Sequence, residues 1–154
     1  MIIEQTGNIL DSTCDLIVIT VNTQGVMGAG LASMFKKHYP AIAEDYRDEC
    51  LRIKRKGGDI FWGALYNQFL FFCTKEHWKN PSKLEWIESG LKELSDMYQD
   101  VFDRLHTPLG GTNSIAIPPL GCGLGGLNWD DVYPLIQKYL GNIEGLTVHV
   151  YLPR

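Results

Sequence analysis

Two glycine-rich loops constrain the fold of this chain, because each one joins a run of apolar residues to the start of a candidate helix. The first glycine loop is residues 22–30, NTQGVMGAG, and the second glycine loop is residues 118–126, PPLGCGLGG. Glycine allows the backbone to adopt positive φ and to pass close to a ligand, while the N–H groups at a helix N-terminus attract anions. The two loops therefore predict a clamp that holds an anion, such as a diphosphate, from both sides. Neither loop has the Gly-Lys-Ser/Thr ending of a P-loop, and neither sets a dinucleotide-binding Gly-x-Gly-x-x-Gly pattern in a proper βαβ unit.

Strand and helix patterns alternate along the rest of the chain. Apolar, β-branched and aromatic runs predict strands at residues 16–21, 60–65, 68–74, 114–117 and 146–152, the second and third of them antiparallel. Apolar spacings of three or four, with start and stop residues, predict helices at residues 31–38, 41–56, 82–105 and 129–140, the last capped by Asn128. At 154 residues without repeats or low-complexity linkers, the chain is expected to form one domain over residues 1–154. Its expected fold is α/β, a three-layer α/β/α sandwich around a mixed, mostly parallel sheet.

Composition argues against several classes of protein. The formal net charge of −4 disfavours a general nucleic-acid coat, although residues 51–83 hold seven Lys and Arg against two acidic residues. This basic strip fits either a solvated helix end or a surface beside an anion-binding cleft. The four cysteines form no Cys-x-x-Cys pair, so we expect reduced thiols and no metal site. Without a signal-peptide pattern or an apolar run near the roughly 18 residues that span a bilayer, we expect a cytoplasmic protein with no membrane contact.

Three motifs, in this order, resemble those of the macrodomain family. The first is V-N-T-x-G-x-M-G-x-G at residues 21–30, and the second is C-T-K-x-H-W at residues 73–78 followed by S-K-L-E at residues 82–85. The third is P-P-L-G-C-G-x-G-G-L-x-W at residues 118–129. Together they are most similar to the branch that contains the DarG antitoxins, which are DNA ADP-ribosyl glycohydrolases, and human terminal ADP-ribose protein glycohydrolase.

The resemblance implies a site for ADP-ribose, with the diphosphate between the two glycine loops and the distal ribose beside Lys75. In this branch the lysine after the threonine is the catalytic residue, which attacks or stabilises the anomeric carbon, and we add His77 as a candidate for proton transfer. The implied ligand-binding residues are Asn8, Ile9, Asn22, Gly28, Ala29, Gly30, Thr74, Pro119, Leu120, Gly121, Cys122, Gly123, Leu124 and Gly125. No cofactor is implied.

The chemistry of lysine fits cleavage of a glycosidic bond. The transition state resembles an oxocarbenium ion, and a neutral amine can attack the anomeric carbon when desolvation or nearby cations lower its pKa. Lys79 and Lys83 are candidate neighbours for that effect. From composition alone, a surface lysine beside Glu76 is the ordinary explanation of Lys75, and an exposed or structural histidine is that of His77. Only the motif context favours the catalytic interpretation.

Three other positions also have both a functional and an ordinary interpretation. Asn22 is the best non-glycine ligand contact, because an amide both donates to and accepts from ribose hydroxyls. Cys122 is interpreted as a small residue that a tight loop tolerates rather than as a nucleophile. Trp129 is interpreted as a packing residue.

Two positions depart from the family pattern. Many macrodomains carry an aspartate where this chain has Asn8, which could still accept a hydrogen bond from the adenine amino group through its carbonyl oxygen. The human relative has an aspartate directly after its Gly-Cys-Gly-Leu, and this chain has Gly125 there. A mechanism that requires this acid is therefore disfavoured, and the glycine is predicted to leave room for a bulky nucleobase.

The implied activity is removal of ADP-ribose from a modified macromolecule, with thymidine-linked ADP-ribose on single-stranded DNA as the leading substrate. The alternatives are a non-catalytic ADP-ribose-binding module and a hydrolase of ADP-ribosylated protein carboxylates or of ADP-ribose 1″-phosphate. The expected partners are ADP-ribose, ADP-ribosylated single-stranded DNA and a cognate DarT-like toxin. The protein is taken as a monomer by default.

Overall fold

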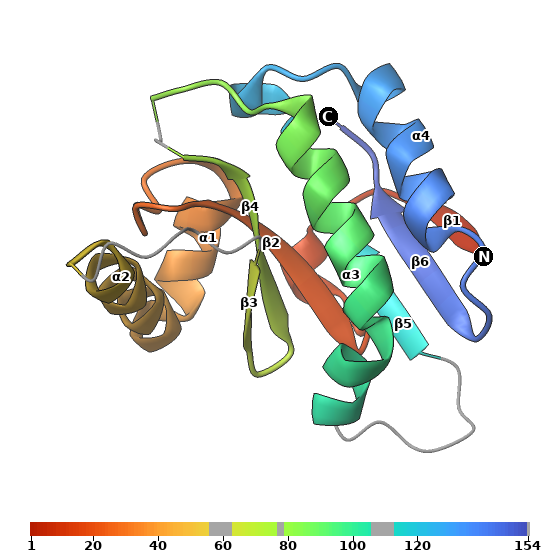
Figure 1. Ribbon diagram of the computed structural model, residues 1–154, viewed down its shortest axis with the longest axis horizontal. Helices are drawn as coiled ribbons and strands as arrows, with labels where there is room; N and C mark the ends of the chain where they lie inside the picture. Colours follow the sequence, from red (N-terminus) through yellow and green to blue (C-terminus); the bar gives the residue numbers. More distant parts are fainter. Residues whose placement is uncertain (56–62, 77–78, 106–112, 154) are drawn as a thin grey trace.

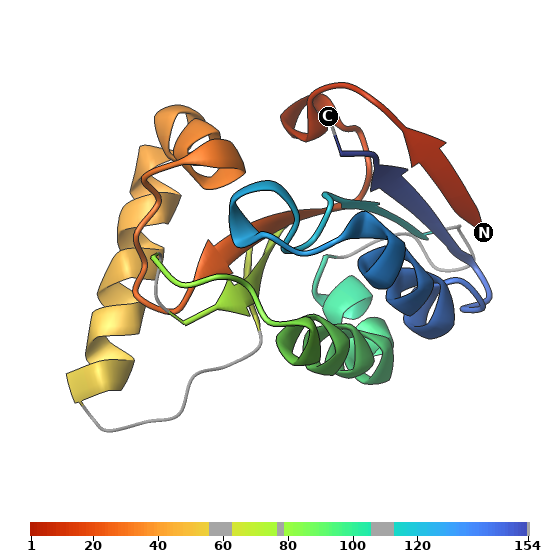
Figure 2. The same ribbon diagram turned by 90° about the horizontal axis from the view of Figure 1, so that it is seen from above.

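A computed structural model of the chain describes residues 1–55, 63–76, 79–105 and 113–153. Within these ranges six strands form one sheet, and α-helices cover both of its faces (Figures 1 and 2). The strands are β1 (Ile2–Gln5), β2 (Leu16–Asn22), β3 (Gly63–Tyr66), β4 (Phe69–Lys75), β5 (Asn113–Ile117) and β6 (Leu146–Tyr151). The helices are α1 (Gly30–His38), α2 (Pro40–Arg55), α3 (Leu84–Arg104) and α4 (Trp129–Leu140), with 3-10 turns η1 (Ile9–Asp11) and η2 (Gly123–Gly125).

The sheet is mixed and mostly parallel, as the sequence predicts. Its strand order is β1-β6-β5-β2-β4-β3, and among these neighbours only β3 and β4 run antiparallel. The hairpin between β3 and β4 turns at Asn67, whose φ of 54° is tolerated by asparagine. The predicted antiparallel pair is therefore confirmed, although residues 60–62 of the first predicted strand lie outside the described residues.

The central strand β2 packs against a separate core on each face of the sheet. Leu16 and Val18 join the core under α3 and α4, whereas Ile17, Ile19 and Val21 join the core under α1 and α2. All five side chains are at most 4% exposed. Burial on both faces is what an unbroken β-branched run predicts, since successive strand residues point to opposite faces. The helix pairs on the two faces complete the α/β/α sandwich seen in Figure 2.

Two features of the fold differ from the sequence prediction. The edge strand β1 was not predicted; its four residues lack a clear alternation of burial and become a strand by pairing in parallel with β6 at the far end of the chain. The long helix α3 begins at Leu84 rather than at Ser82, because Lys83 is the N-cap residue and has an extended backbone, with φ −113° and ψ 132°. The predicted cap of α4 is confirmed, since Oδ1 of Asn128 accepts from the N–H of Asp130 at 2.9 Å.

The topology brings the three sequence motifs to one edge of the sheet. The neighbours β5, β2 and β4 are parallel, so their carboxyl ends lie on the same side, where ligands bind in open α/β sheets. The second glycine loop follows β5, the first glycine loop follows β2, and Lys75 is the last residue of β4.

No helix within the described ranges has both the length and the apolar character of a membrane span. The structure describes all four cysteines, and no disulfide joins them.

Candidate active site

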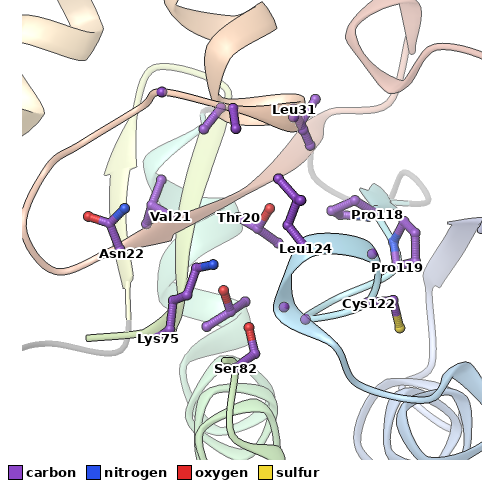
Figure 3. A pocket seen from close by; sticks show the side chains of 18 of the residues that line it. Thr20, Val21, Asn22, Leu31, Lys75, Ser82, Pro118, Pro119, Cys122 and Leu124 are labelled. Carbon is purple, nitrogen blue, oxygen red and sulfur yellow. The ribbon is translucent and has the colours of Figure 1, made fainter. Parts of the chain in front are cut away.

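A cavity of about 1020 Å³ lies at the carboxyl ends of β5, β2 and β4 (Figure 3). Both glycine loops, the first turn of α1, the end of β4 and the segment before α3 contribute to its wall. The lining residues are Thr20, Val21, Asn22, Val26, Gly28, Ala29, Gly30, Leu31, Ala32, Thr74, Lys75, Lys79, Ser82, Pro118, Pro119, Gly121, Cys122, Gly123, Leu124 and Gly125. The volume suits a nucleotide-sized ligand.

Most of the residues that the sequence predicts for the site line this cavity together. They are Lys75, Asn22, Gly28, Ala29, Gly30, Thr74, Pro119, Gly121, Cys122, Gly123, Leu124 and Gly125. The structure does not bring the other predicted ligand residues into the lining. Leu120 is fully buried in the core under α3 and α4, and Ile9 is buried in the core under α1 and α2. His77 lies outside the described residues.

Asn8 lies apart from the main cavity. Its Oδ1 accepts a hydrogen bond from the N–H of Leu10 at 3.0 Å and so caps the 3-10 turn η1. Asn8 lines a second, smaller cavity of about 320 Å³ near the ends of β1 and β6. The oxygen predicted to accept from adenine therefore already accepts one backbone hydrogen bond, and Asn8 is not among the residues that line the main cavity.

The side chain of Asn22 shapes the first glycine loop. Its Nδ2 donates to the carbonyl of Val26 at 2.8 Å, and its Oδ1 accepts from the N–H of Gln24 at 3.0 Å and of Val26 at 3.2 Å. The turn also requires Gly25, since its φ is +74° and an added Cβ would lie 2.7 Å from the Cα of Arg47. The amide predicted to bind ribose thus holds the loop in the shape that forms the cavity wall.

Two further hydrogen-bonding groups fix the first glycine loop to its surroundings. Oγ1 of Thr23 donates to the carbonyl of Glu76 at 2.9 Å, which ties the loop to the end of β4 beside Lys75. The hydroxyl of Tyr46, fully buried in α2, donates to the carbonyl of Asn22 at 2.8 Å. Burial raises the pKa of Tyr46 far above its ordinary value, so the phenol remains a donor. The backbone that carries the lysine and the backbone of the loop therefore keep a fixed relative position.

The first turn of α1 faces the cavity without a side-chain cap. Ala29 is the N-cap residue and makes no side-chain hydrogen bond, and Gly30, Leu31 and Ala32 of the first turn line the cavity. The first N–H groups of a helix have no acceptor within the helix and lie at the positive end of its dipole. This end of α1 is suited to bind a phosphate or another anion.

The second glycine loop is a tight turn on the opposite side of the cavity. The N–H of Cys122 donates to the carbonyl of Pro119 at 3.1 Å, and the N–H of Leu127 donates to the carbonyl of Gly121 at 2.9 Å. Burial raises the pKa of the Cys122 thiol, which keeps sulfur in its weakly nucleophilic protonated form. This result agrees with the interpretation of Cys122 as a small residue within a tight loop.

Lysine side chains supply the positive charge of the cavity. Lys75 is half-buried and extends from the end of β4 into the cavity, as Figure 3 shows. Lys79 is exposed and also lines the cavity, whereas Lys83 is exposed and does not line it. Of the two cations proposed to act on the amine of Lys75, the structure brings Lys79 to the same cavity.

Several lining residues are not among the predicted site residues, and Ser82 is the most informative of them. Thr20 and Val21 could have been found as the strand residues that precede the first glycine loop. Ser82 is the first residue of the S-K-L-E motif at residues 82–85, where its sequence pattern predicts only the start of a helix. It reaches the cavity because its N–H donates to the carbonyl of Gly125 at 2.9 Å, which holds Ser82 against the second glycine loop.

Comparison with known proteins identifies the fold. The Macro domain family matches residues 18–136 of the chain. The chain belongs to the macrodomain family. A DNA ADP-ribosyl glycohydrolase from Thermus aquaticus is 41% identical to this macrodomain over 152 residues, which cover 96% of the chain and 40% of the relative.

Solved structures agree with this assignment. The macrodomain of Mycobacterium tuberculosis DarG is 33% identical, with a TM-score of 0.83 over 100% of this chain and 99% of that one. The structure of Thermosipho africanus DarTG in complex with ADP-ribose is 36% identical, with a TM-score of 0.79 over 96% of this chain and 40% of that one. This macrodomain spans 40% to 42% of the length of the DNA ADP-ribosyl glycohydrolases that it matches.

Proposed function

We propose that this macrodomain removes ADP-ribose from ADP-ribosylated DNA, with thymidine in single-stranded DNA as the modified nucleoside. The observation that carries the proposal is the entry of Lys75 into the cavity formed by the two glycine loops. The names of the DNA ADP-ribosyl glycohydrolases that it resembles, and the ADP-ribose bound in the Thermosipho africanus relative, support the same class of reaction.

The diphosphate of ADP-ribose binds between the first turn of α1 and the second glycine loop. Backbone N–H groups from both sides donate to the phosphoryl oxygens, and the cation of Lys79, which also lines the cavity, adds local positive charge. The net charge of −4 does not oppose this binding, because a local site depends on nearby charges more than on the total.

Hydrolysis breaks the bond between the anomeric carbon of the distal ribose and the base nitrogen. The oxygen of water is added to that carbon, and the base leaves with a proton. Lys75 acts at the anomeric carbon: its neutral amine forms a bond to this carbon as the bond to the base nitrogen breaks, and water then displaces the amine, which leaves Lys75 unchanged. The assignment of His77 to the proton transfer rests on the sequence alone. The reaction as proposed uses no metal or cofactor, so we expect full activity in the presence of EDTA.

The decisive experiment compares wild type with Lys75→Ala on thymidine-ADP-ribosylated single-stranded DNA. We expect the variant to release ADP-ribose at least about 100-fold more slowly and still to bind ADP-ribose in calorimetry, because the glycine loops are intact. Lys83→Ala is the matched control, since Lys83 is an exposed lysine outside the cavity lining.

Other outcomes identify the alternative functions. Faster release from carboxylate-linked peptides than from DNA would refute the preference for DNA. Phosphate release from ADP-ribose 1″-phosphate, without activity on DNA, would indicate a phosphatase. Binding of ADP-ribose without turnover of any of these substrates would indicate a binding module.

The cellular setting is also a proposal. We infer that the protein acts in the cytoplasm, as a monomer, against a DarT-like toxin that modifies DNA. The fusion of a DNA ADP-ribosyl transferase with a DNA ADP-ribosyl glycohydrolase in a Thermosipho africanus relative supports the pairing with a toxin. Rescue of growth when such a transferase is co-expressed with wild type, but not with Lys75→Ala, tests the pairing, and light scattering tests the monomer.

A further inference from the structure

Ser82 carries a buried hydroxyl that has no hydrogen-bond partner. The residue is 6% exposed, and among the described residues its Oγ is the single buried side-chain oxygen or nitrogen that lacks a partner. Buried polar groups are almost always hydrogen-bonded, because loss of water without a replacement partner costs free energy. An orphaned hydroxyl in the wall of a cavity therefore indicates that the partner comes from the molecule bound there.

The second glycine loop is built around this hydroxyl. The N–H of Ser82 donates to the carbonyl of Gly125 at 2.9 Å, and a Cβ added to Gly125 would lie 2.3 Å from Oγ and 3.0 Å from Cβ of Ser82. Gly125 does not have the positive φ of Gly121 and Gly123, so it is required for space rather than for backbone conformation. Ser82 occupies the space into which a side chain at position 125 would extend. This space is therefore not open to a nucleobase, contrary to the prediction made from the glycine.

The position of Ser82 relates it to the reactive end of the site. In Figure 3 the side chain of Ser82 lies next to the second glycine loop, on the side of the cavity where Lys75 enters from β4, and its Oγ faces Gly125. Under the proposed function this side holds the distal ribose, whose anomeric carbon Lys75 must reach. The hydroxyl is neutral at physiological pH and can both donate and accept, which matches the hydroxyl groups of a pentose.

We propose that Ser82 is a substrate-contacting residue whose hydroxyl forms a hydrogen bond with a hydroxyl of the distal ribose. The inference rests on the proposed function, because it needs ADP-ribose in the cavity. Oγ is covered by protein atoms, so rotation to another staggered rotamer about Cα–Cβ, or a small shift of the second glycine loop, accompanies binding. Next to the second glycine loop, the ribose thus meets the hydroxyl of Ser82. An acidic side chain at position 125 would not fit there, because Ser82 occupies its space.

The test is calorimetric titration of wild type and Ser82→Ala with ADP-ribose and with ADP, which lacks the distal ribose. We expect Ser82→Ala to bind ADP-ribose roughly 3- to 10-fold more weakly and to bind ADP as wild type does. The thermal midpoint of the ligand-free variant should be unchanged or higher, because the mutation removes an unsatisfied buried hydroxyl and keeps Cβ. Ser89→Ala is the matched control, since Ser89 is exposed in the same helix that follows Ser82.

The possible results separate this inference from the proposed function. Equal affinities of wild type and Ser82→Ala for ADP-ribose would overturn the assignment of Ser82 alone. Equal losses for ADP-ribose and ADP would place the contact at the diphosphate, or, with a lower thermal midpoint, would indicate a structural role; both overturn the ribose contact. Failure of the wild type to bind ADP-ribose would overturn the proposed function and this inference together.

Discussion

Substitution of Gly125 by alanine tests whether the space beside the second glycine loop is filled as the structure indicates. The new Cβ would lie 2.3 Å from Oγ and 3.0 Å from Cβ of Ser82, and contacts under 3.4 Å are tighter than most real Cβ contacts. Because the neighbour is a short side chain next to a backbone hydrogen bond, rotation of Oγ relieves only part of the clash. Either the loop moves or the bond from Ser82 to the carbonyl of residue 125 lengthens.

The expected cost follows from these contacts. Overpacking of this kind costs about 1–3 kcal/mol, and weakening of one backbone hydrogen bond adds about 0.5–1.5 kcal/mol. The restricted unfolded state of alanine offsets about 0.4–1 kcal/mol. The net loss for Gly125→Ala is therefore about 0.5–4 kcal/mol, which lowers the thermal midpoint of a domain of this size by about 1–16 °C.

A double-mutant cycle assigns the cost to Ser82. Urea unfolding of wild type, Gly125→Ala, Ser82→Ala and the double variant should show that the alanine at 125 costs at least about 1 kcal/mol less when Oγ is absent. Gly28→Ala is the control within the same cavity, because its Cβ would meet only Val26 Cγ1 at 3.9 Å and its φ is not positive. It should leave stability unchanged or raise it by up to about 1 kcal/mol.

Two results would refute this reasoning. One is a Gly125→Ala protein whose unfolding free energy matches that of wild type, which would mean that the second glycine loop can move to accept a methyl group. The other is an equal cost of the alanine with and without the Ser82 hydroxyl, which would place the clash elsewhere.

Three further changes probe the walls of the cavity. Thr23→Val removes the hydrogen bond to the carbonyl of Glu76 and should lower the free energy of unfolding by about 1 kcal/mol in urea; no loss would show that the loop is held by other contacts. Tyr46→Phe removes the phenol hydroxyl that donates to the buried carbonyl of Asn22 and should lower the free energy of unfolding in urea by about 1–3 kcal/mol. An unchanged free energy of unfolding would show that this hydrogen bond does not hold the first glycine loop in place. Burial raises the pKa of Cys122, so its thiolate forms only at higher pH than in an unfolded peptide; site-resolved mass spectrometry should find slower alkylation at pH 8, faster alkylation as pH rises, and protection by ADP-ribose. Alkylation as fast as in the peptide would contradict the burial of this thiol.

Local sequence signals were sufficient where a few neighbouring residues decide the structure. The unbroken β-branched run predicted a strand buried on both faces, and Asn128 predicted the start of α4. The glycine loops and the Thr-Lys pair at the end of β4 predicted a site at the carboxyl ends of the strands, where the cavity lies. These signals work because burial on both faces, helix capping and positive φ each favour particular residue types in a short window.

Long-range contacts decided the remaining features. The strand β1 exists because it pairs with β6 at the other end of the chain, and its own residues carry no clear period. Asn8 is used to cap η1, Leu120 is turned into the core, and Ser82 lies beneath Gly125. No short window of sequence contains these pairings, because each depends on the space left when segments distant along the chain pack together. The sequence by itself thus determined the family of the fold and the edge of the sheet that carries the site, whereas only the tertiary structure decided which side chains reach the cavity and which one is left there without a partner.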